Sequence, residues 1–269
     1  MDQLPLTPAL DTQLADGWLS VWFNQPERRN PLTDAVVSDL LVLCGHLATR
    51  SDIRGVALRG RGGYFCAGGD LREFRAMADA SRGATIDASA RIGRLLAAVD
   101  ALPQVTLAII EGAAMAGGLG LACSCDVTVG TTDAAFGFSE TRIGITPAQI
   151  APYVLRKAGY ANGRRLMLTG ARFNGAAACE LGLLDLCVDQ GETLETTVQS
   201  IKRDVLNCSP EAVGACKSLL RALPNLEGDN AILAAAENFT DCLQGPSGRE
   251  GVAAFLEKRS PHWAMGSHG

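Results

Sequence analysis

The sequence predicts an α/β protein with a helical C-terminal region, and three observations support this. Short apolar segments typical of buried strands alternate with glycine-containing turns and helical patterns over the N-terminal part. From about residue 193 onward, helical patterns follow one another with no strand pattern between them. The 269 residues, 47% hydrophobic and 20% charged, are enough to bury a full core. We therefore expect an α/β core over 1–192 and a helical subdomain over 193–269, packed on the core or swapped around it.

The periodicity of apolar residues predicts the individual elements in order. Strands are expected at 18–23, 56–58, 105–110 and 127–129. Helices of the core are expected at 34–48, 71–77 and 86–102, the last of them stopped by Pro103. Residues 81–85 have the composition of a mobile loop. In the C-terminal region, helices are expected at 193–206, 210–220, 230–242 and 248–257.

Charge and cysteine content restrict the class of protein. The 24 Lys and Arg against 29 Asp and Glu give a net charge of −5, which argues against nucleic acid as a partner. The apolar stretch 105–125 contains Glu111 and several glycines, so we expect a strand, a glycine turn and a helix start there rather than a membrane span. Nine cysteines without zinc-site spacing, and no signal-peptide pattern, favour a reduced, cytoplasmic protein without a bound metal.

Histidine is scarce, which limits the possible catalysts. Of the 3 His, His46 lies in an apolar helical pattern and His262 is close to the C-terminus. His268 lies in the final Met-Gly-Ser-His-Gly, which resembles a remnant of an expression vector. A histidine-based zinc site or a Ser-His-Asp triad is therefore not expected, and proton chemistry should fall to another residue type.

Two glycine-rich turns each connect a strand pattern to a helical pattern, at 65–71 and at 112–120. Backbone N–H groups at such junctions point outward, and glycine allows a ligand to approach them closely. One turn could hold a phosphate, whereas two could direct their N–H groups at one oxygen and form an oxyanion hole. Tight packing explains the glycines equally well at this point. The motifs of a P-loop, a dinucleotide-binding turn and a G-x-S-x-G nucleophile elbow are absent.

Glu140 is the candidate for acid–base chemistry. It stands between an apolar stretch and Gly144, and burial of a carboxyl group raises its pKa toward the range that a general acid or base needs. The alternative is an exposed Glu140 that forms a surface ion pair with Arg142.

Seven sequence features, in this order, resemble the crotonase (enoyl-CoA hydratase/isomerase) superfamily over residues 18–263. They are residues 26–32 (PERRNPL), 65–71 (FCAGGDL), 112–126, Glu140, 168–170 (LTG), 178–183 (ACELGL) and 250–259 (EGVAAFLEKR). The resemblance implies a spiral of ββα repeats, as in ClpP- and crotonase-like proteins, with a C-terminal helical trimerisation region. It also implies homotrimers, often paired into hexamers, and an acyl-CoA substrate with no cofactor besides its coenzyme A.

The resemblance also assigns roles to individual residues. Gly69 and Gly117 match the positions whose N–H groups hold the thioester oxygen, where the charge of an enolate gathers. Glu140 matches the acid/base that exchanges a proton with the α-carbon. The positions that match coenzyme A contacts are Arg28, Ala67, Gly68, Asp70, Phe255 and Lys258, the last two of them in a neighbouring subunit.

One departure from the family pattern bears on the reaction. Hydratases like the family prototype have a second glutamate where this chain has Gly120, so Glu140 acts alone, which suffices for a double-bond isomerase. Residues 114–121 and 145–154 nevertheless look more like bacterial methylglutaconyl-CoA and isohexenylglutaconyl-CoA hydratases of leucine and acyclic-terpene breakdown. Those substrates carry a second carboxylate, for which the candidate partners are Arg72, Arg75, Arg82 and Arg142.

The leading prediction is therefore hydration of a branched glutaconyl-type CoA thioester, with an enoyl-CoA isomerase as the alternative. A non-catalytic acyl-CoA-binding or RNA-binding protein is the alternative from another class, and the net charge and Glu140 argue against it. Substitution of Gly120 by Glu is expected to raise activity on straight-chain enoyl-CoAs.

Overall fold

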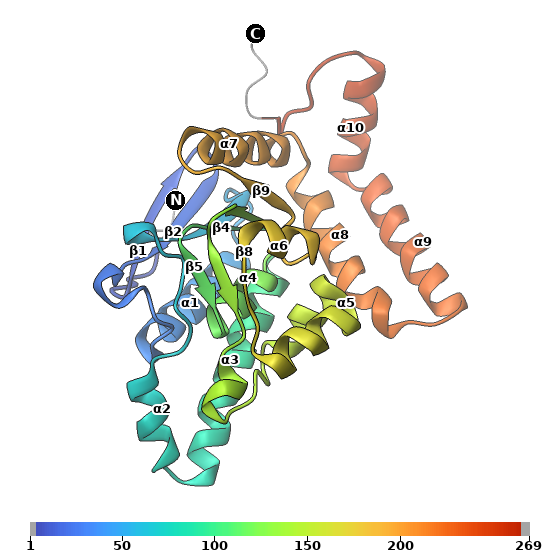
Figure 1. The fold of residues 1–269 in the computed structure, drawn as a ribbon. Helices are drawn as coiled ribbons and strands as arrows, with labels where there is room; N and C mark the ends of the chain where they lie inside the picture. Colours follow the sequence, from blue (N-terminus) through green and yellow to red (C-terminus); the bar gives the residue numbers. More distant parts are fainter. Residues whose placement is uncertain (1–3, 265–269) are drawn as a thin grey trace.

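A six-stranded sheet forms the centre of the computed structural model, which describes residues 4–264 (Figure 1). Its order is β1–β2–β3–β4–β6–β9, and only the edge strand β1 runs antiparallel to its neighbour. The strands are β1 (Leu10–Ala15), β2 (Trp18–Phe23), β3 (Gly55–Gly60), β4 (Val105–Ile110), β6 (Val127–Thr131) and β9 (Leu186–Val188). The α/β prediction is thus confirmed.

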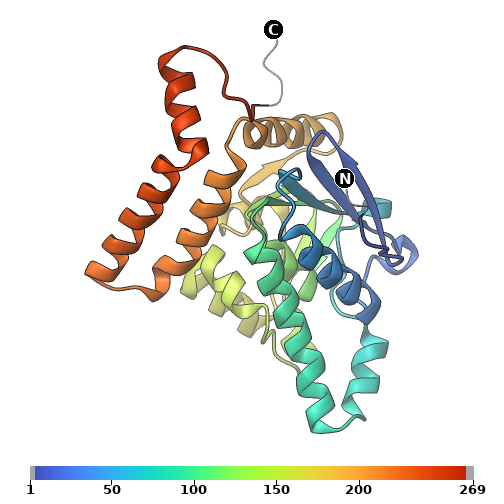
Figure 2. The same ribbon diagram turned by 180° about the vertical axis from the view of Figure 1, so that it is seen from behind.

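Helices cover both faces of this sheet. In β4, Ala108 and Ile110 belong to the main core, where α1 (Asp34–Leu47) and α3 (Arg82–Ala101) pack side by side (Figure 2). Leu107 and Ile109 alternate with them and contact the second cluster, to which α7 (Glu192–Leu206) contributes Leu194 and Val198. This alternation explains why the parallel strands read as continuous apolar runs, since a sheet covered on both faces has no polar side.

A smaller sheet stands beside the first and carries the candidate site. It consists of β5 (Ala113–Met115), β7 (Ala135–Gly137) and β8 (Arg172–Asn174), with β5 and β7 parallel. The helices α4 (Gly117–Cys123) and α6 (Gly175–Glu180) pack on this sheet, α5 (Ala151–Thr169) packs on α4, and α2 (Leu71–Ala78) packs on α3.

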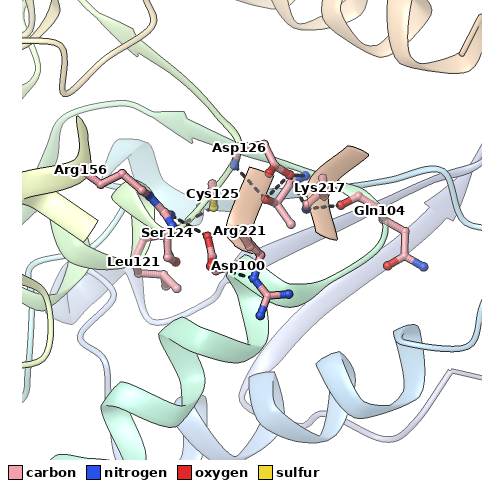
Figure 3. Close-up of polar contacts among 10 residues, drawn as sticks. Asp100, Gln104, Leu121, Ser124, Cys125, Asp126, Arg156, Lys217 and Arg221 are labelled. Atoms are coloured by element: carbon pink, nitrogen blue, oxygen red, sulfur yellow. Dashed lines mark hydrogen bonds and ion pairs between the residues drawn. The ribbon is translucent and has the colours of Figure 1, made fainter. Parts of the chain in front are cut away.

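The C-terminal helices α8 (Pro210–Ala222), α9 (Asp229–Gln244) and α10 (Pro246–Leu256) form an arm that extends from one side of the body (Figure 1). The Lys217 ammonium of α8 lies 2.6 Å from an oxygen of Asp126 and 2.7 Å from the carbonyl oxygen of Gln104 (Figure 3). Asp100 of α3 pairs with Arg221 of α8 and with Arg156 of α5. These contacts attach α8 to the body of its own chain.

The predicted strands and helices are found at nearly the expected positions, with one clear error at residues 81–85. Arg82–Ala101 is a helix, because the Ser81 side chain accepts a hydrogen bond from the Ala84 N–H and caps it. α7 packs on the main sheet, so the boundary at residue 193 stays a prediction. The expected vector remnant, 265–269, lies outside the described residues.

The nine cysteines are all free, and Cys123 and Cys125 are buried like small apolar residues. None of the helices within residues 4–264 combines the length and the apolar character needed to cross a membrane.

Candidate active site

Three parallel segments bring the candidate residues to one edge of the small sheet. β5 pairs with Cys66 on one side, at Ala114, and with β7 on the other, with Met115 opposite Gly137. Gly69, Gly117 and Glu140 follow these paired positions by two or three residues. Because parallel strands end at the same edge, the two glycines and the carboxyl group leave the sheet together, with Gly117 in the middle.

The loop of residues 67–70 is held close to the end of β5. Its Gly68 carbonyl accepts a hydrogen bond from the Leu32 N–H at 2.9 Å. Gly68 has a φ of 92°, and a Cβ there would lie 2.9 Å from the carbonyl oxygen of Met115, so only glycine fits. The phenyl ring of Phe74, in α2, covers the neighbouring Gly69.

Gly117 follows a strained turn and lies next to Gly69. Ala116 has a φ of 49° and a ψ of −122°, unusual values for alanine, and turns the chain from β5 into α4. A Cβ at position 117 would lie 3.9 Å from the Gly69 nitrogen. Within residues 4–264, neither the Gly69 N–H nor the Gly117 N–H donates a hydrogen bond to a backbone carbonyl outside its own helix or strand. Two adjacent N–H groups of this kind can stabilise one oxyanion.

Glu140 is buried, with 8% of its surface exposed. Its Oε2 has no hydrogen-bond partner within the described residues, and burial raises the pKa of this carboxyl group above its usual range. The interpretation as a surface ion pair is wrong, because Glu140 is inside, while the Arg142 side chain lies against Gly170 at the end of α5. A buried carboxyl group with an unused oxygen can accept and return a proton.

Substitution of Glu140 by glutamine is expected to stabilise the protein at neutral pH. Between the ordinary pKa of a glutamate and the raised pKa of Glu140, the folded chain retains a proton that the unfolded chain has released. The stability of the wild type therefore falls as the pH rises through this window, and glutamine removes the loss. Thermal unfolding at equal protein concentration should show a higher Tm for Glu140→Gln at pH 7 and no difference below the ordinary pKa. A lower Tm for the variant at pH 7 would contradict the buried, unpaired carboxylate.

The residues expected to contact coenzyme A separate into two groups. Arg28 pairs with Asp70, and the Ala67 N–H donates to the Arg29 carbonyl at 2.9 Å, so residues 28–29 and 67–70 lie together beside the glycine loop. Asp70 also caps α2 by accepting from the Arg72 N–H. Phe255 is in α10, and Lys258 comes directly after this helix. The helix α10 lies on the side of the molecule away from α2 (Figures 1 and 2). Within one chain these two residues do not reach the site.

The four arginines considered for a substrate carboxylate are all exposed. Arg72 and Arg75 are on α2, and Arg82 is the first residue of α3. Arg142 lies against Gly170. Three of the candidates therefore lie on α2 and α3, and the fourth contacts the C-terminal end of α5.

Two further residues at the site did not stand out in the sequence. Leu32 lies against Gly117, with its Cδ1 3.4 Å from a Cβ at that position, and Ile150 lies against Gly120. Leu32 belongs to the PERRNPL motif, so its place in the sequence could have indicated it. Ile150 contacts Gly120 across a separation of thirty residues, which no local pattern reveals.

Position 120 has no room for the glutamate side chain that was expected to raise activity. A Cβ at this position would lie 2.0 Å from Cγ2 of Ile150, which is buried. The structure therefore argues against a gain of activity from Gly120→Glu alone, because the larger side chain overpacks this contact.

Comparisons of the sequence and of the structure with known proteins point to the same family. The enoyl-CoA hydratase/isomerase family matches residues 14–266. The mouse protein "enoyl-CoA hydratase domain-containing protein 2, mitochondrial" is 33% identical over 266 residues, covering 95% of this chain and 88% of its own length. Among solved structures, Pseudomonas aeruginosa AtuE superposes with a TM-score of 0.93 at 38% identity, covering 96% of this chain and 100% of its own. An enoyl-CoA hydratase/isomerase from Marinobacter aquaeolei gives 0.92 at 33% identity, covering 96% and 99%.

These similarities confirm the predicted crotonase fold and the prediction of an enzyme rather than a non-catalytic binding protein. Three findings point to the same family. They are the sequence motifs, the convergence of Gly69, Gly117 and Glu140 at one edge of the small sheet, and the matches over nearly the whole chain. The chain belongs to the enoyl-CoA hydratase/isomerase family, the crotonase superfamily, whose reactions process acyl-CoA thioesters.

Proposed function

We propose that the enzyme hydrates an α,β-unsaturated acyl-CoA, with the N–H groups of Gly69 and Gly117 as the oxyanion hole and Glu140 as the acid/base. The observation that carries this proposal is a buried Glu140 carboxyl group with an unused oxygen, which leaves the small sheet at the same edge as two adjacent glycine N–H groups. No cofactor besides the coenzyme A of the substrate takes part. Arg28, Ala67, Gly68 and Asp70 lie beside the hole, on the side where the thioester leads to coenzyme A.

In the proposed reaction the thioester oxygen accepts hydrogen bonds from both glycine N–H groups. Glu140 takes a proton from water as the water oxygen bonds to the β-carbon, and the electrons of the double bond move toward the thioester oxygen as an enolate. Glu140 then returns the proton to the α-carbon and the carbonyl reforms. Water is added across the double bond with no net change at the enzyme.

For the acyl group, we propose a branched glutaconyl-type chain such as that of methylglutaconyl-CoA or isohexenylglutaconyl-CoA. Support comes from the resemblance of residues 114–121 and 145–154 to hydratases of those substrates. The exposed guanidinium groups of Arg72 and Arg75 on α2, and of Arg82 on α3, are available to pair with the distal carboxylate. Such hydration would serve leucine or acyclic-terpene breakdown in the cytoplasm.

Double-bond isomerisation is the second candidate, and the contact between Gly120 and Ile150 favours it. The space of a second carboxylate is filled by an apolar side chain, so Glu140 has no polar partner at that position. A single carboxyl group can move one proton along an acyl chain without water.

A panel of unsaturated acyl-CoAs in water enriched in heavy oxygen separates the two reactions. Hydration places the label in the product, and we expect labelled product, in highest yield from branched glutaconyl thioesters. A shifted double bond without label would instead establish the isomerase. Absence of turnover with every thioester would refute both candidates.

We also propose that the chain assembles as a homotrimer, or as a hexamer of two trimers, through its C-terminal arm. α8 and α9 bury none of their residues in the single chain, and large apolar side chains are exposed along the arm, among them Leu220, Ile232, Phe239 and Phe255. Sedimentation is expected to give the mass of a trimer or its double. A stable monomer at micromolar concentration would contradict this role of the arm.

A further inference from the structure

Two consecutive side chains just before α5 pack against glycines of two neighbouring helices, α3 and α4. Gln149 lies against Gly93 of α3, where its Oε1 is 2.3 Å from the position of a Cβ. Ile150 lies against Gly120 of α4, where its Cγ2 is 2.0 Å from the position of a Cβ. A side chain at either glycine would collide with its partner. The two pairs therefore act as a fitted contact between α3, α4 and the start of α5.

Several interactions fix Ile150 in this place. The Gln149 side-chain amide donates a hydrogen bond to the Ser89 hydroxyl of α3 at 3.1 Å. The Ile150 carbonyl accepts hydrogen bonds from the N–H groups of Tyr153 and Val154, both at 3.1 Å, in the first turn of α5. Ile150 is 3% exposed, so its side chain has little freedom to move away from α4. The Ile150 side chain is therefore a rigid apolar wall, and a wall of this kind can discriminate between acyl groups by shape.

The position of this wall relative to the oxyanion hole follows from the geometry of α4. Gly120 is three residues beyond Gly117 and lies on nearly the same face of the helix. Three residues advance an α-helix by about 4.5 Å, and a carbon–carbon bond spans about 1.5 Å. If the thioester oxygen is held at Gly117 and the acyl chain runs along α4 toward Gly120, Ile150 lies beside the β- and γ-carbons of that chain.

We propose that Ile150 is a specificity-determining residue, which contacts the acyl group at the β-carbon and limits the substituents that this carbon carries. Gln149 acts through it, as a positioning residue that ties the wall to α3. The inference rests on the proposed function in two respects, the place of the thioester oxygen and the course of the acyl chain along α4. It adds the identity of the side chain that selects acyl groups by their shape.

Binding of two saturated, unreactive thioesters tests the inference apart from catalysis. Butyryl-CoA and isovaleryl-CoA differ by one methyl group on the β-carbon, and calorimetry gives the ratio of their dissociation constants. In Ile150→Ala we expect this ratio to move about tenfold in favour of isovaleryl-CoA, as is usual for a pocket that gains room for one methyl group. Val154→Ala, a truncation of a buried residue one turn further along α5, should leave the ratio as in the wild type.

A second measurement covers the case in which Ile150→Ala folds poorly. Ile150→Val removes one methyl group and should shift the ratio in the same direction by a smaller factor. Independently, Gly120→Ala is expected to lower the Tm, and addition of Ile150→Ala should recover part of that loss. An unchanged binding ratio in both Ile150 variants would overturn the inference. Loss of the proposed function appears differently, as a wild type that binds these thioesters selectively and converts no unsaturated one.

Discussion

Substitution of Glu140 by glutamine is expected to reduce turnover by about 10²–10⁴-fold, the usual contribution of a positioned general acid/base. The amide keeps the size of the carboxyl group but cannot take a proton from water or return it to the α-carbon. Acyl-CoA binding should remain, because the glycine N–H groups and the loop at 67–70 are unchanged. Steady-state kinetics together with calorimetric binding of a saturated thioester measure the two effects separately.

The pH dependence of turnover distinguishes a catalytic role of Glu140 from a merely structural one. Burial raises the pKa of Glu140, so activity that needs its carboxylate should fall below this raised pKa on the acidic side. Glu180→Gln is the matched control, because Glu180 is an exposed glutamate at the end of α6. Wild-type turnover in Glu140→Gln would remove this residue from the mechanism.

The main elements of the fold were predictable because their apolar residues are periodic and buried. β4 is apolar on both sides, and the Leu-rich spacing of α1 is that of a helix with one buried face. The strands that sequence reasoning missed lack this signal. β1 is a largely exposed edge strand, and β5, β7, β8 and β9 have three residues each, too few to show alternation. α5 was missed because Pro152 and the non-helical Gly159 interrupt its pattern.

The candidate site was predictable only as far as its residues lie in local motifs. Gly117 and Glu140 each follow a short strand and Gly69 follows the bridge at Cys66, and the motif order pointed to all three. Their convergence depends on the pairing of Cys66, β5 and β7, which joins residues far apart in the chain. The contact of Ile150 with Gly120 was likewise hidden, and it turned an expected gain from Gly120→Glu into an expected collision. Long-range packing of this kind leaves no pattern in neighbouring residues.

Substitution of Gly117 by alanine is expected to lower kcat by about 10²–10³-fold, the loss typical when one oxyanion-hole donor fails. The added methyl group would lie 3.4 Å from Cδ1 of Leu32 and 3.9 Å from the Gly69 nitrogen. This is enough room for the chain to fold. The methyl group would nevertheless lie close to the two nitrogens, where a thioester oxygen must come within about 2.9 Å of each.

This variant decides between the two interpretations of the glycine turns, tight packing and an oxyanion hole. Because the protein around position 117 has room for a methyl group, a packing role predicts near-normal activity and stability. An oxyanion hole predicts a folded protein with a severe loss of kcat. Gly45→Ala in α1, where a Cβ meets nothing within 4 Å, is the control and should gain about 0.5–1 kcal/mol of stability with unchanged kcat. Normal kcat in both variants would leave the Gly117 N–H without a catalytic role, since the oxygen it is proposed to hold would then be held elsewhere.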